Sequence, residues 1–156
     1  MKSVTLTIGK EEVMQEVNKT TSYVGKKIDE AAKPVEGQNT TAYDRVRTTA
    51  ATKELLERFW DEAASIATSR MMRFTTSTSN GSSYIANLFL TDRWNEALTQ
   101  GMNDSLFSFF VAFIVSRWCR IADKEEEAAY MSDANAMLDD VMRKVYFRSS
   151  PTREGV

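Results

Sequence analysis

Acidic side chains form the densest cluster of residues that could do chemistry. Glu125, Glu126 and Glu127 are consecutive, and grouped carboxylates can bind a cation. At the start of a predicted helix, acids also complement the helix dipole, and this solvent-facing interpretation is favoured here. Asp139 and Asp140 are adjacent, so on a helix they point to different parts of the surface and do not form an acid–base pair. The sequence therefore predicts neither a metal site nor paired catalytic carboxylates.

Nucleophilic chemistry has little support in the composition. The chain has one cysteine, Cys119, and no histidine, which removes His metal ligands and the Ser-His and Cys-His arrangements. Cys119 stands among apolar residues, which predicts a buried structural thiol. One cysteine cannot form an internal disulfide, so nothing points to an oxidising compartment. Phosphate-loop, dinucleotide-binding and zinc-binding motifs are missing from the sequence as well. We therefore predict no enzyme and no cofactor.

The aromatic residues offer a third possibility, a binding pocket. Trp60, Trp94 and Trp118 stand among apolar residues at helical spacing, which favours a place in the core. The chain has 156 residues, 42% of them hydrophobic, with a formal net charge of −2. These values fit one globular domain and argue against a free-standing nucleic-acid binder. The longest apolar run, 106–119, is too short and too interrupted to span a membrane, and predicts a core helix.

Hydrophobic periodicity predicts which elements must position these side chains. Residues 3–8 alternate and are rich in β-branched types, which predicts a short extended N-terminal segment. The predicted helices cover about 10–18, 49–73, 91–122 with a break or kink at Gly101, and 124–147. Pro34 and Gly37 mark a loop between the first two helices. We predict a mainly all-α fold, a helical bundle of four to five helices with one β-hairpin insertion, in a single domain spanning residues 1–156.

The hairpin is predicted from the stretch RFTTSTSNGSSYIAN, residues 73–87. Asn80-Gly81 is typical of a two-residue type I′ turn, because both central residues of that turn need positive φ. Pairing outward from this turn sets Ser79 against Ser82 and Ser77 against Tyr84. The flanks are almost entirely polar, and an isolated hairpin of this kind is marginal in water. The sequence therefore predicts either a loose loop or an arm, about 74–87, that a neighbouring molecule completes.

The C-terminal segment is the second predicted arm. The final helix cannot continue past Pro151, so residues from about 147 to 156 are expected to project as a tail. This end of the chain is basic, with Arg143, Lys144, Arg148 and Arg153. These side chains either complement the dipole of the last helix or contact an acidic partner or DNA.

The arrangement of these segments is similar to a known class of proteins. A short extended N-terminus precedes a helix that carries ERFWDEA. A polar insertion follows, then a helix carrying FIVSRWCRIAD and a last helix that ends in KVYFRSSPTR. This layout resembles small virion proteins of tailed phages and prophages, especially of Bacteroides-type hosts, that act as head–tail connectors, also called adaptor or neck proteins. Trp60, Trp118 and residues 146–153 carry the resemblance.

The resemblance implies a structural protein without enzymatic activity. Such proteins form an oligomeric ring, commonly of twelve copies, between portal and tail. The implied partners are sister subunits in a homo-oligomeric ring, the portal protein, and tail or neck proteins, with passive passage of DNA and no membrane. The implied location is the neck or tail region of the virion, after synthesis in the bacterial host cytoplasm. The residues expected in the assembly arms are Thr76, Thr78, Asn80, Gly81, Tyr84, Tyr146, Phe147, Arg148, Pro151 and Arg153.

Three other functions fit the same sequence. A tail terminator or tail-completion protein could share the layout. A soluble intracellular helical module could bind a partner helix through its aromatic helices, and it would fold its hairpin on its own bundle. An enzyme without histidine would need two converging acids with perturbed pKa values, and the sequence shows no such pair.

Overall fold

A computed structural model describes residues 1–31, 41, 47–49 and 52–149. The predicted loop at Pro34 and Gly37 lies outside these residues, as do the predicted tail residues Pro151 and Arg153. The helices are α1 (Lys10–Ala31), α3 (Lys53–Met71), α4 (Thr99–Ala122) and α5 (Lys124–Tyr146), with short 3₁₀ turns at Met72–Phe74 and Glu96–Leu98. The strands are β1 (Lys2–Gly9), β2 (Thr75–Asn80) and β3 (Ser83–Leu90).

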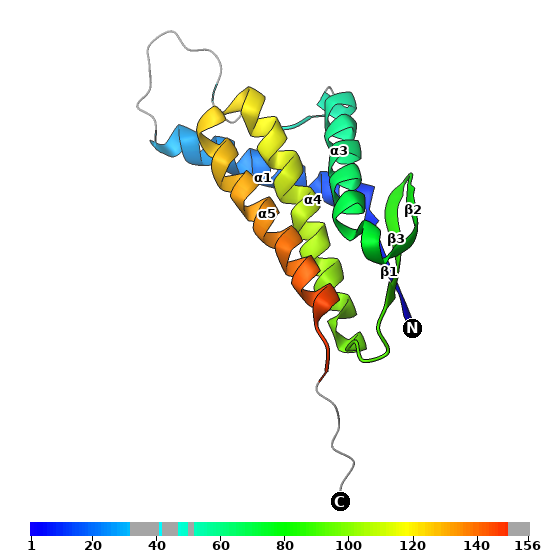
Figure 1. The fold of residues 1–156 in the computed structure, drawn as a ribbon. Helices are drawn as coiled ribbons and strands as arrows, with labels where there is room; N and C mark the ends of the chain where they lie inside the picture. Colours follow the sequence, from blue (N-terminus) through cyan, green and yellow to red (C-terminus); the bar gives the residue numbers. More distant parts are fainter. Residues whose placement is uncertain (32–40, 42–46, 50–51, 150–156) are drawn as a thin grey trace, which may run out of the picture.

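Helix α4 lies at the centre of the molecule. It packs along α5 for most of its length and also contacts α3 and α1. Figure 1 shows α1 crossing the α4–α5 pair rather than lying along it. The prediction of a mainly helical fold with a β element is therefore confirmed, although the helices do not form a regular bundle. The reason is that β1 runs directly into α1 at Lys10, so the strand's place in the sheet fixes the direction of the helix.

Several predicted helix boundaries need correction. The first helix was predicted to end near residue 18, but α1 continues to Ala31, because Val13, Val17 and Val24 form one buried stripe. The helix predicted from residue 91 begins only at Thr99 and runs through Gly101 without a break. A Cβ added at Gly101 would lie 3.3 Å from the ammonium group of Lys144, so this glycine permits a close approach of α5.

The apolar character of α4 comes from burial inside the protein. The segment Glu96–Ala122 is long and apolar enough to cross a membrane by length and composition alone, but 61% of its most apolar window is buried inside the structure. Core helices of soluble proteins pass the same test. Phe110 shows the packing: its ring lies 4.6 Å from that of Trp60 on α3 and 5.3 Å from that of Tyr84 on β3.

The three strands form one antiparallel sheet in the order β1-β3-β2. Strand β1 pairs with β3 along its whole length, from Lys2 opposite Leu90 to Gly9 opposite Ser83. Alternate side chains of these two strands point into the core, as expected for a sheet with one buried face. The buried side chains of the sheet are Val4, Leu6, Ile8, Tyr84, Ala86, Leu88 and Leu90.

The predicted register of the hairpin is wrong. Asn80 pairs with Tyr84 and Ser79 with Ile85, and a bulge between Thr75 and Ser77 shifts the register once more. The connection is therefore longer than the two-residue turn expected from Asn80-Gly81. Tyr84 points into the core, where its side chain is 1% exposed, because the pairing of β3 with β1 sets it opposite the buried Ile8.

Asn80 fastens the end of the hairpin to α3. Its side-chain carbonyl accepts a hydrogen bond of 2.7 Å from the indole N–H of Trp60, and its amide donates to Asp61 at 3.0 Å. Trp60 is fully buried, so its N–H depends on this bond.

We expect Asn80→Ala to lower the free energy of unfolding by about 1–3 kcal/mol, because it leaves the buried indole N–H of Trp60 without a partner. Urea unfolding followed by tryptophan fluorescence measures this. Ser82→Ala is the matched control, since Ser82 is exposed in the same connection. Equal midpoints for the two variants would show that the Trp60–Asn80 bond contributes nothing.

Candidate functional site

The acidic cluster singled out in the sequence lies at the start of α5. Glu125, Glu126 and Glu127 lie in the first turn of α5, where they suit the helix dipole, and Glu127 pairs with Arg120 at 3.3 Å. Within the described residues, no group of three or more His, Cys, Asp or Glu side chains could hold a metal ion. Cys119 is fully buried, and burial raises the pKa of its thiol to about 12, which keeps it unreactive.

A polar cluster that was not predicted joins α4 to α5. The ammonium group of Lys144 donates to Asp140 at 2.5 Å and to Ser105 at 3.2 Å, and the Ser105 hydroxyl donates to Asp140 at 2.6 Å. A lysine beside a serine is a known pair for nucleophilic catalysis. Here the serine proton points to a carboxylate and the lysine is held by an ion pair, so neither group is free to activate the other. The cluster connects two helices.

The sequence indicates the pair within α5 but not the contribution of Ser105 from α4. Asp140 and Lys144 are four residues apart, which is the spacing of an ion pair on one helix. Ser105 lies 35 residues away in the sequence and reaches Asp140 only through helix packing.

The hydrogen bond from Lys144, followed by that from Ser105, lowers the pKa of Asp140 below its usual value. A carboxyl group with a lowered folded-state pKa stabilises the fold above its unfolded pKa, and that stabilisation is lost as the pH falls through the folded pKa. We therefore expect Asp140→Asn to reduce the free energy of unfolding by roughly 1 kcal/mol at pH 7. The difference from the unsubstituted chain should shrink below about pH 4.

Chemical denaturation at a series of pH values measures this difference. Asp139→Asn is the control, because the neighbouring Asp139 forms only an exposed ion pair with Arg70. A loss for Asp140→Asn that stays constant from neutral to strongly acidic pH would contradict the assignment.

The predicted hairpin arm is part of its own domain. Tyr84 is buried and its hydroxyl lies 2.9 Å from that of Thr68 on α3. Strand β3 already has a partner on each side, so no neighbouring molecule can complete it. Of the two hairpin strands, β2 is the one at an edge of the sheet. Thr76 and Thr78 on it are exposed, as is Gly81 at the tip of the hairpin.

The hydroxyl-rich sequence of β2 therefore has a local explanation. The strand lies at the edge of the sheet, exposed along nearly its whole length, and its side chains bond within the sheet. Asn87 on β3 donates to Ser77 at 2.9 Å and accepts from Thr5 on β1 at 2.8 Å. The bulge at Thr76 disturbs the outer edge, which is a common protection against unwanted strand pairing.

The start of the predicted tail is held on the protein and exposes two aromatic rings. Tyr146 is 54% exposed and packs edge-on against Phe74, and Phe147 is 50% exposed. Two residues further on, the backbone N–H of Ser149 donates to the carbonyl of Arg93 at 3.0 Å, and the Arg93 guanidinium donates back to the Ser149 carbonyl at 2.8 Å. Tyr146, Phe147 and Arg148 therefore lie at the end of α5, where Tyr146 contacts Phe74 at the start of the predicted hairpin segment.

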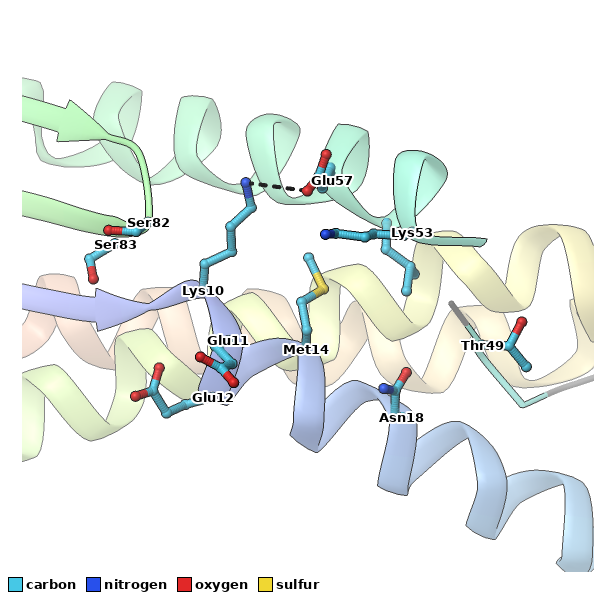
Figure 2. A pocket seen from close by; sticks show the side chains of 11 residues that line it. Lys10, Glu11, Glu12, Met14, Asn18, Thr49, Lys53, Glu57, Ser82 and Ser83 are labelled. Atoms are coloured by element: carbon cyan, nitrogen blue, oxygen red, sulfur yellow. Dashed lines mark ion pairs between the residues drawn. The ribbon is translucent and has the colours of Figure 1, made fainter. Parts of the chain in front are cut away.

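One cleft lies between the first turns of α1 and α3 and has a volume of about 720 Å³. Figure 2 shows Lys10 reaching from α1 towards Glu57 on α3, an ion pair of 3.9 Å, with Lys53 beside it. Glu11 and Glu12 also line this cleft. Charges of both signs alternate and no pair of acids converges, so the cleft has no evident catalytic arrangement.

The second cleft is a groove of about 470 Å³ formed by α1, α4 and α5. Its lining is mainly apolar and half-buried, and two exposed acids, Glu16 and Asp133, lie on it from opposite helices. The groove was missed at the level of sequence, because α4 is apolar on nearly all sides and its pattern does not reveal which face stays open. Its lining residues are Glu16, Thr20, Phe107, Ser108, Val111, Ala112, Tyr130, Asp133 and Met137.

Comparisons with known proteins do not assign this chain to a family. A scan against protein-family models, a search of curated proteins and a search of solved structures each find no match for this chain. The surfaces of the protein are therefore the observations that bear on its function.

Proposed function

We propose that this chain is a structural virion protein of a tailed phage or prophage, a head–tail connector subunit that forms an oligomeric ring between portal and tail. The observation that carries the proposal is the exposed pair Tyr146 and Phe147 at the tip of α5. Adjacent exposed aromatic side chains are typical of protein interfaces. In this role the protein carries out no chemistry and needs no cofactor. This agrees with the hydrogen bonds that join Ser105, Asp140 and Lys144 to one another.

The resemblance in sequence layout supplies the class of partner. In the proposed ring, sister subunits contact one another, and the portal and a tail or neck protein bind the two faces. The net charge of −2 suits a ring through which DNA passes without being gripped. The protein would then reside in the neck of the virion after synthesis in the host cytoplasm. A tail terminator or tail-completion protein would make the same kind of ring.

A second function is favoured by a different observation. The groove between α1, α4 and α5 has the apolar lining of a site that receives an amphipathic helix, and the hairpin is folded on its own domain. Both features fit a helical protein-binding module that works as a monomer or dimer.

The oligomeric state separates the two functions. We expect the full chain to form a closed ring of one copy number, seen as a population of uniform mass by native mass spectrometry and as annular particles by negative-stain electron microscopy. Measurements over a wide concentration range are needed, since a weak ring dissociates on dilution.

A chain that stays monomeric or dimeric at every concentration would overturn the ring and favour the binding module. Neighbouring genes provide an independent check. Portal, capsid and tail genes on either side would support the virion role, and their replacement by unrelated genes would count against it.

A further inference from the structure

The tip of α5 combines exposed aromatic rings with positive charge. Beside Tyr146 and Phe147, the side chain of Arg143 is 77% exposed and has only a 3.5 Å pair with Asp140, and Arg148 is exposed. These four residues form the basic aromatic tip. Aromatic and arginine side chains are the types that most often anchor protein interfaces.

The groove between α1, α4 and α5 has the opposite character. Phe107, Val111 and Met137 give it an apolar lining, and Glu16 and Asp133 add two carboxylates. Both carboxylate residues are exposed, and within the described part of the chain neither forms an ion pair. The groove therefore complements the basic aromatic tip in both polarity and charge.

The tip cannot fill the groove of its own molecule. Asp133 is on α5 and Phe147 directly follows the end of that helix, 14 residues later, which corresponds to about 21 Å along the axis. From Phe147 to Ser149 the chain does not turn back, because the bonds between Ser149 and Arg93 hold it beside the loop before α4. The two complementary surfaces can therefore meet only between molecules.

We propose that the basic aromatic tip of one copy docks in the groove of a second copy. This inference rests on the proposed ring, for which it names the subunit contact. Tyr146 and Phe147 pack against the apolar lining, and Arg143 and Arg148 pair with Glu16 and Asp133. Because the donor and acceptor surfaces are different parts of one chain, the contact is head-to-tail, and its repetition gives a ring or an open filament.

Cysteine cross-linking of full-length chains tests the contact even when it is weak. One variant carries Phe147→Cys at the tip, and an isotope-labelled second variant carries Val111→Cys in the groove. The control partner carries Ile121→Cys, an exposed apolar position, 64% exposed, on the same helix but not among the lining residues. The native Cys119 is buried in every variant. Mixtures are oxidised with oxidised glutathione, and mass spectrometry counts the mixed dimers.

We expect the Phe147–Val111 dimer to form at least about tenfold faster than the Phe147–Ile121 dimer, because docking raises the effective concentration of the two thiols. Equal rates would overturn the contact. Rings without preferential cross-linking would retain the ring and reject this interface. Preferential cross-linking without rings would retain the interface and reject the ring.

A charge exchange gives a second test that needs no cysteine. Asp133→Arg and Arg148→Glu should each weaken self-association by about tenfold, measured by sedimentation velocity, and an equimolar mixture of the two variants should restore it through the exchanged pair. Glu125→Arg, at the exposed start of α5, is the control and should leave association unchanged. A mixture no stronger than either variant alone would contradict the pairing of Arg148 with Asp133.

Discussion

The pairing of β1 with β3 is the contact on which the rest of the structure depends. It joins residues 2–9 to residues 83–90, so segments far apart in the sequence must meet before the sheet exists. Without β1 the hairpin would be an isolated pair of strands, which is marginal in water. With it, β1 and β3 together present one apolar face to the core, and the direction of β1 also sets the direction of α1.

Buried polar groups then hold the outer segments on this scaffold. The indole N–H of Trp60 binds Asn80 in the hairpin, and the indole N–H of Trp94 donates to the carbonyl of Lys144 at 2.8 Å. Each bond gives a buried indole N–H its acceptor. The first links the hairpin to α3, and the second links the segment before α4 to α5. The backbone at the end of α5 is consequently held in place by Trp94 and Arg93, and the ring of Tyr146 by Phe74, which lowers the entropy cost of docking.

Within the described residues, the structure shows apolar and charged surfaces and no evident catalytic arrangement. The polar side chains of Ser105, Asp140 and Lys144 are hydrogen-bonded to one another. What remains available is a pair of surfaces of opposite charge, each combined with apolar area, at separate places on one molecule. Such a pair favours association between identical copies, and the electrostatic part selects orientation more than it adds affinity.

The sequence by itself determined the periodic elements: alternation gave β1, and the spacing of Leu56, Trp60 and Ala63 gave α3, because burial of one face leaves a local period. It also determined that Cys119 and the tryptophans are core. Only the tertiary structure decided the hairpin register and the place of Ser105 beside Asp140. It alone decided that β1 pairs with β3. It also decided which face of α4 lines a groove. These features depend on contacts between distant residues, and a local pattern carries no information about which distant segment will supply the partner.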